Sequence, residues 1–255
     1  MKITKIMLVL LIFARSLPGF CQPKIVEVRF PVVDKNRHIA IDLANGTVDV
    51  EGYNGHEIVI TQISYITPYK VLEGFDRLNR SNQYLYDTVI NYKVLSTTAG
   101  LFQIAIAGKP GKLHIKVPNA LKLLSLRSYS SNPTDSLNVN NYVGPLQVEG
   151  LVKNINVSKV TGPFYISGKY GKISLKEIFW NQDASWTFHE FPYMVTSLSS
   201  DIAIFVPKII QATFALGSTN GSVFSNLSLN SKMSVNGGGI NINAVSNNGN
   251  IYLIE

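Results

Sequence analysis

The chain has 255 residues, of which 45% are hydrophobic and 15% charged, and its formal net charge is +7. The basic residues are spread thinly without a cluster, which disfavours nucleic acid or an anionic membrane surface as the partner. The single cysteine, Cys21, excludes an internal disulfide, so stability has to come from burial of apolar side chains.

The first 21 residues have the pattern of a secretory signal peptide. Lys2 and Lys5 precede an apolar core at 6–14, which is too short to span a bilayer. Removing 1–21 takes away three basic residues and no acid, so the mature net charge would be +7 − 3 = +4. No later apolar run reaches membrane-spanning length, and we expect no transmembrane span.

Cleavage after Cys21 would leave Gln22 as the first residue of the mature protein. The alternative is a lipoprotein signal with Cys21 lipidated, but a small residue should then precede the cysteine, and Phe20 is bulky. We expect a bacterial protein that is secreted, or that is periplasmic or held in the cell envelope. No linker or low-complexity run divides residues 22–255, which predicts one domain.

Alternation of apolar and polar residues predicts strands along the N-terminal half. Pro68 to Arg80 break the alternation, and their apolar residues recur at helical spacing, which predicts one short helical or irregular arm near 68–80. The expected strands on either side of the arm are 25–30, 38–43, 47–53, 57–63, 88–95, 101–107 and 112–118.

Residues 143–178 form a ladder of four nine-residue units, VGPLQVEGL, VKNINVSKV, TGPFYISGK and YGKISLKEI. Each unit holds two apolar residues two positions apart, so both point to one face of a strand. A fixed period with one strand per unit predicts an all-β, right-handed parallel β-solenoid or β-helix-like domain. We expect one interior row of Leu146, Ile155, Phe164 and Ile173. An antiparallel meander is the alternative.

The ladder is interrupted at 179–193 by a stretch that holds both tryptophans. Three further strand units follow at 197–206, 217–227 and 246–255, each with a turn rich in Ser and Asn. The asparagines keep turn positions, which favours amide ladders at stacked corners over a polar stripe presented to a glycan.

Several of these stretches carry a family resemblance. ANGTVDVEGYNGHEIVI, the Lys-Val-Pro at 116–118, the ladder, STNGSV and GGGININAVSNNGNIYL resemble the bacterial putative-adhesin family of unknown function, which is related to autotransporter-adhesin head domains. The family's Asn-Gly-(Ser/Asp)-Ile/Val step is present at 220–223 and 248–251, whereas Ser-Ser replaces Asn-Gly at 199–200. The resemblance implies a parallel β-solenoid in an envelope or secreted protein, and it brings no family site.

The sequence offers little support for catalysis. The four histidines are too far apart for a local metal motif, and a G-x-S-x-G elbow is missing. Asp49 and Glu51 share a strand face, but the other acids are scattered. We therefore expect a non-enzymatic protein with no catalytic residue, no metal and no cofactor. The alternative is a polysaccharide-active enzyme on a parallel β-helix.

The aromatic interruption is the sequence's candidate for ligand binding. Its rigid rings, with amide and carboxylate groups between them, suit stacking on sugar rings or on a protein surface. Packing of the same rings as one more strand layer is the competing interpretation. The candidate ligand-binding residues are Trp180, Asn181, Gln182 and Asp183. The expected partner is a glycan, an envelope protein or a second copy of the chain joined through terminal strand edges.

Overall fold

The structure is a computed structural model, and it describes residues 23–32, 38–43, 46–65, 91–96, 100–107, 112–129, 135–180 and 192–255. Two compact units are present, 1–26 with 63–89 and 27–62 with 90–255, and the account below concerns the second. The expected signal segment and the expected arm near 68–80 lie outside the described residues. Within those residues, no helix has the length and hydropathy needed to cross a membrane.

The described elements are all β-strands, as the alternation predicts. The first nine strands are β1 (Pro23–Pro31), β2 (His38–Leu43), β3 (Thr47–Tyr53), β4 (Glu57–Tyr65), β5 (Asn91–Ser96), β6 (Leu101–Ala107), β7 (Lys112–Pro118), β8 (Leu123–Ser128) and β9 (Ser136–Asn140). The others are β10 (Leu146–Gly150), β11 (Asn154–Ser158), β12 (Phe164–Lys176), β13 (Tyr193–Phe205), β14 (Ala212–Ser218), β15 (Val223–Ser225), β16 (Ser234–Val235), β17 (Ile240–Ser246) and β18 (Ile251–Ile254).

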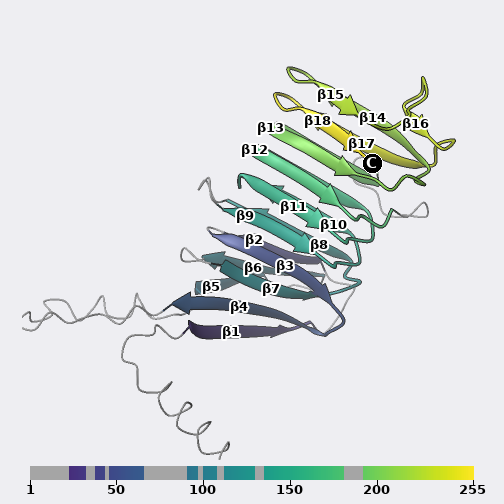
Figure 1. Cartoon of the computed structure of the whole chain (residues 1–255). Coiled ribbons are helices and arrows are strands. Elements are labelled where there is room, and N and C mark those ends of the chain that lie inside the picture. The colour runs from purple at the N-terminus through teal and green to yellow at the C-terminus, as the bar shows by residue number, and fades with distance from the viewer. Residues whose placement is uncertain are drawn as a thin grey trace, which may run out of the picture. The chain divides into compact units, whose positions relative to one another are not determined.

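Most strands belong to one of two parallel stacks (Figure 1). The first stack runs in the order β6, β2, β8, β10, the first half of β12, the first half of β13, β17 and β14. The second stack runs β7, β3, β9, β11, the second halves of β12 and β13, β18 and β15. A strand of the first stack and the strand that comes next in the chain, which belongs to the second stack, together make one layer.

The nine-residue ladder is parallel and in register, as expected, but its repeat is half a layer. Leu146 pairs with Phe164, and Ile155 pairs with Ile173, so partners lie 18 residues apart. The expectation of one interior row is therefore wrong, because the chain turns at the corner after Gly150 and alternate units enter different stacks. All four apolar residues are buried, in two rows instead of one.

A wholly parallel solenoid is also wrong, because the sheet is mixed. Pairing is antiparallel between β4 and β7, between β5 and β6, and between β14 and β16. The connection between β5 and β6 is only four residues long, and a short connection of this kind joins antiparallel neighbours, whereas parallel strands need a longer crossover. The other two antiparallel strands lie on the outermost layers, where no further parallel neighbour is present.

Serine side chains fix the corner between the two stacks at the C-terminal layers. Ser218 Oγ accepts a hydrogen bond from the Gly221 N–H and donates one to the Gly249 carbonyl at 2.7 Å. Ser246 Oγ accepts from the Gly249 N–H and donates to the Ser200 carbonyl at 3.2 Å. Each hydroxyl thus closes its own turn and joins that turn to the next layer.

An asparagine ladder runs beside the serines. Asn220 Nδ2 donates to Asn248 Oδ1 at 2.8 Å, and Asn248 Nδ2 donates to Ser199 Oγ at 3.3 Å. These bonds satisfy polar groups between stacked turns, which confirms the ladder interpretation of the Asn-rich turns for these residues.

The layers do not follow the order of the chain. The strands β2 and β3 lie between the layer of β6 and β7 and the layer of β8 and β9. At the other end, β17 and β18 lie between β13 and the layer of β14 and β15. Both terminal strands are paired, since β18 has a neighbour on each side and β1 pairs with β4.

Candidate functional site

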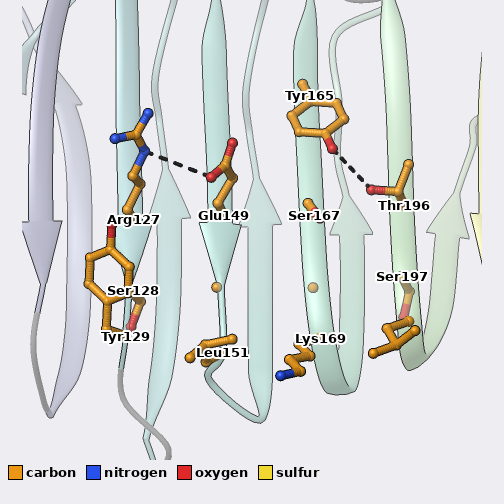
Figure 2. A pocket seen from close by; sticks show the side chains of 13 residues that line it. Arg127, Ser128, Tyr129, Glu149, Leu151, Tyr165, Ser167, Lys169, Thr196 and Ser197 are labelled. Carbon is orange, nitrogen blue, oxygen red and sulfur yellow. Dashed lines mark hydrogen bonds and ion pairs between the residues drawn. The ribbon is translucent and has the colours of Figure 1, made fainter.

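A groove of about 610 Å³ crosses β8, β10, β12 and β13 at the corner where the chain leaves the first stack (Figure 2). Each of these strands contributes three consecutive residues, one to each side of the groove and one to its floor. The contributing triplets are 127–129, 149–151, 167–169 and 196–198, and Tyr165 completes the lining.

The first wall is polar. Arg127 pairs in register with Glu149, Glu149 with Ser167, and Ser167 with Thr196, so the four side chains form one cross-strand row. Arg127 Nε lies 3.7 Å from Glu149 Oε2, and both side chains are about two-fifths exposed. Thr196 Oγ1 donates to the Tyr165 hydroxyl at 3.4 Å (Figure 2). This wall presents a cation, an anion and hydroxyl groups along one line.

A hydrogen-bond chain behind the wall holds Glu149 in place. Gln147 Nε2 donates to Glu149 Oε1 at 2.7 Å, and Ser125 Oγ donates to Gln147 Oε1 at 3.2 Å. His38 Nε2 lies 2.8 Å from Ser125 Oγ, and because that hydroxyl donates to Gln147, the imidazole is its donor. Burial lowers the pKa of His38, and nearby Arg127 and Lys122 lower it further, so the imidazole is neutral at pH 7.

The second wall is formed by Tyr129, Leu151, Lys169 and Leu198, which directly follow the corner. Tyr129 is 55% exposed and Leu198 43% exposed, which is unusual for large apolar side chains. Lys169 Nζ lies 5.3 Å from the ring of Tyr170, outside the groove. The wall therefore offers an aromatic ring, two aliphatic side chains and one ammonium group to a ligand.

The floor is made of small residues because the corner has no room for larger ones. Ser128, Gly150, Gly168 and Ser197 pair in register across the four strands. A Cβ on Gly168 would lie 2.9 Å from Ile173 Cδ1 in the core, and one on Gly150 would lie 3.2 Å from Ile155 Cδ1. Tight packing beneath the corner thus produces the shallow backbone floor between the two walls.

The dimensions of the groove suit an extended chain. Four strands span about 14 Å along the stack, and residues two apart on a strand separate the walls by about 7 Å. A linear molecule lying along the stack would contact the polar wall on one side and the aromatic and aliphatic wall on the other. Among the lining residues, Glu149 is the sole carboxylate.

A second hollow of about 430 Å³ lies on the outer face of the second stack. Asp49 there contacts Lys112 Nζ at 2.6 Å and accepts from Asn138 Nδ2 at 2.7 Å. Glu51 Oε2 lies 3.3 Å from His114 Nε2. Both carboxylates that share this strand face are thus engaged by basic side chains. Among the described residues, no three His, Cys, Asp or Glu side chains gather closely enough to hold a metal ion.

Trp180 packs on the core of the stack. Its ring centroid lies 5.0 Å from that of Tyr193 and 5.8 Å from that of Phe164, and both of these rings are fully buried. Trp180 itself is half-buried, and its indole N–H has no acceptor within the described parts of the chain. It does not line the groove. Asn181, Gln182 and Asp183 lie outside the described residues.

The stacking shows where the aromatic interruption enters the ladder. Val143, Thr161 and Phe179 form successive bridges, and the first two are followed by Gly-Pro. The carbonyls of Pro145, Pro163 and Pro192 then accept equivalent hydrogen bonds from the first or second residue of a strand in the preceding layer. Residues 180–191 therefore occupy the sequence position of a single glycine.

The sequence interpretation missed the groove because each residue of its two walls is an ordinary outward residue of its own strand. The triplets are separated by about 20 to 30 residues and meet only through the parallel register. A usable signal is the recurrence of a small residue between two larger ones at the end of each strand: RSY, EGL, SGK and TSL.

Comparison with known proteins finds no matching family model and no matching curated protein. Similar solved structures include a putative cell adhesion protein from Clostridium sporogenes ATCC 15579, with 13% identity, 91% of this chain and 99% of that chain covered, and a TM-score of 0.43. A putative adhesin from Bacteroides fragilis NCTC 9343 has 12% identity, coverage of 92% and 99%, and a TM-score of 0.44. A putative lipid binding protein from Parabacteroides distasonis ATCC 8503 has 11% identity, coverage of 93% and 98%, and a TM-score of 0.25. These scores are too low to transfer a function, so the groove itself is the basis for the proposal.

Proposed function

We propose that the protein is a non-enzymatic binding protein of the bacterial cell envelope, and that the groove over β8, β10, β12 and β13 holds a linear glycan. The observation that carries the proposal is the pair of unlike walls, one polar and one aromatic and aliphatic, separated by a floor of small residues.

A sugar chain matches both walls. Its hydroxyl groups suit the guanidinium of Arg127, the carboxylate of Glu149 and the hydroxyl of Thr196, which stand in one row. The apolar face of a pyranose ring suits stacking on Tyr129 and contact with Leu198. The charged groups of the lining are Arg127, Lys169 and Glu149, whose net charge of +1 favours a neutral or weakly acidic ligand.

The chemistry of the groove favours binding over cleavage. Glycoside hydrolysis generally uses two carboxyl groups about 5 to 9.5 Å apart on either side of the scissile bond. The lining supplies one, Glu149, and its two oxygens face Gln147 and Arg127. A carboxylate held in this way is suited to accepting hydrogen bonds from a sugar hydroxyl.

The location in the cell is part of the proposal. The pattern of residues 1–21 supports export, with free secretion favoured over lipidation of Cys21. The sequence resemblance to the putative-adhesin family, and through it to autotransporter-adhesin heads, supports a place in the envelope. Residues 180–183 are the rival location for ligand contact, and the observation in their favour is the indole N–H of Trp180, which lacks an acceptor among the described residues.

The test is a glycan array screened with the full chain, followed by calorimetric titration of the best oligosaccharide. Arg127→Ala and Tyr129→Ala should each weaken binding by roughly tenfold or more, because each removes one wall's main contact. Thermal unfolding should stay close to that of the unsubstituted protein, since Tyr129 is 55% exposed and Arg127, about two-fifths exposed, forms only a surface ion pair with Glu149.

Matched controls separate binding from general surface effects. Arg29→Ala removes another ion-paired surface arginine, and Ile209→Ala removes an apolar side chain that is 84% exposed and does not line the groove. Both controls should bind normally. If no oligosaccharide on the array binds, or if both groove variants bind like the controls, the proposed glycan function is wrong. Selective binding of an extended peptide in the groove would also contradict it.

A further inference from the structure

The outermost strand of the second stack, β15, has an open edge. It pairs with β18 in parallel, from Val223 opposite Ile251 to Ser225 opposite Leu253, and the residue registers place no other described strand beside it. Figure 1 shows β15 at the end of the stack, beyond β18. An unpaired edge of this kind presents free backbone groups to any strand that reaches it.

The hydrogen bonds show which backbone groups are open. The Ile251 N–H donates to the Ser222 carbonyl at 2.9 Å, and the Asn226 N–H donates to the Leu253 carbonyl at 3.3 Å. Alternate residues of a strand direct their N–H and C=O groups to opposite sides. Residues 222, 224 and 226 therefore face β18, and Val223 and Ser225 direct their backbone groups outward.

The other ends of the two stacks are covered at least in part. On the same side as β15, β16 covers the first two residues of β14, through Ala212 opposite Val235 and Thr213 opposite Ser234. At the opposite end, β5 covers β6 and β4 covers β7. Proteins usually protect an open edge with a covering strand or with charged side chains. Residues 209–231 contain no Lys, Arg, Asp or Glu, so β15 lacks that protection as well.

The side chains at this edge are apolar and exposed. Val223 continues the interior column of Ile202 and Ile251, which are both fully buried, yet it is 39% exposed because no layer follows. Phe224 is 50% exposed and stacks on Tyr252 with a centroid distance of 5.2 Å. The end of the hydrophobic core is thus left open at β15.

We infer that β15 pairs with β15 of a second copy of this chain, antiparallel about a two-fold axis at Phe224. In that arrangement Val223 lies opposite the partner subunit's Ser225, and the two exchange both N–H to C=O bonds, as does the symmetry-related pair. The edge is complementary to a second copy of itself, because the outward N–H and C=O groups of Val223 match those of the partner subunit's Ser225. Its lack of charge also lets two copies meet here, although each carries a net charge of +7.

The test is the mass of the full chain in solution, measured by sedimentation equilibrium up to about 100 μM, a concentration at which a dimer with a Kd of about 10 μM is mostly assembled. The unsubstituted protein should reach a dimer. Ser225→Pro removes the outward N–H without removing a bond to β18, and it should yield a monomer. Ser225→Ala keeps the N–H and should remain dimeric. Phe224→Lys places two ammonium groups at the axis and should also yield a monomer.

Cross-linking tests the register. In the Cys21→Ser background, Phe224→Cys should form a disulfide-linked dimer, because residues at the two-fold axis lie about 4.5 Å apart between their Cα atoms. Val143→Cys, at another exposed apolar position, should not cross-link. The inference is overturned if the protein stays monomeric, if it forms open-ended filaments, or if folded Ser225→Pro and Phe224→Lys variants dimerise like the original.

Discussion

At the residue scale, Gly249 shows how closely the layers approach at the corner. A Cβ at this position would collide with the backbone carbonyl of Ser200 in the neighbouring layer. Backbone atoms of paired strands cannot move aside as the end of a side chain can. Gly249→Ala should therefore lower the free energy of unfolding by about 1 to 3 kcal/mol, measured by chemical denaturation.

Gly217 provides the matched control for this substitution. It lies in β14 near the same corner, but a Cβ there meets nothing within 4 Å. Gly217→Ala should leave stability unchanged or raise it by up to about 1 kcal/mol, because alanine reduces the entropy of the unfolded chain. Equal stability of the two variants would show that the glycine at 249 is not required by contact between layers.

At the element scale, residues 180–191 should be dispensable for the groove. They occupy the position of one glycine in the ladder, between Phe179 and Pro192. Replacing 180–191 by a single Gly should give a folded protein that still binds glycan, because no groove residue is removed. Stability should fall by no more than about 3 kcal/mol, since the half-buried Trp180 loses its contacts with Phe164 and Tyr193. Calorimetric titration and thermal unfolding measure the two effects.

The single substitution Trp180→Ala, with residues 181–191 kept, separates the effect of losing the indole ring from the effect of losing the whole segment. It should reproduce most of the stability loss and leave binding intact. If instead binding is lost while the fold persists, in the replacement or in Trp180→Ala, the ligand is held by the aromatic interruption and the groove assignment fails.

The strands were the most predictable elements. The alternation gives the bounds of β2, β3, β6 and β7 as the structure has them, because the alternate apolar residues of these strands are the ones that face the core. The alternation predicts which face of a strand is buried, but it does not predict which strand pairs with it. Ile155 and Phe164 have the same pattern, yet they belong to different stacks because the chain turns between them. The groove depends on those pairings, so its residues could not be assembled from the sequence.

At the scale of the whole molecule, the order of the layers could not be predicted from the sequence. The interior columns consist mostly of Ile, Val and Leu, with aromatic residues such as Phe164 and Tyr193 in only some layers, so few side chains mark which layers are neighbours. The second layer in space holds β2 and β3, and the C-terminal β17 and β18 enter before β14 and β15. The C-terminal strand β18 is consequently built into the stack, with a strand on each side.

Because of this order, deleting the last five residues tests how far the stability of the stack depends on its C-terminal strand. The strand β18 joins β13 to β15, and its Ile251 and Leu253 are fully buried. Burial of each of these side chains contributes about 2 to 3 kcal/mol, and the backbone pairing to two strands is lost with them. Since domains have about 5 to 15 kcal/mol in total, deleting 251–255 should abolish cooperative unfolding near the original midpoint, measured by calorimetry.

The control is the deletion of Glu255 alone. That residue contributes only a hydrogen bond from its N–H to Asn226 Oδ1 and a contact of 3.6 Å with Lys208 Nζ, both at the surface. Exposed ion pairs contribute at most about 1 kcal/mol, so the shorter deletion should unfold almost as the full chain does. If the five-residue deletion also unfolds normally and only its self-association changes, β18 acts as a removable edge. The stack would then not depend on having its C-terminal strand between two others.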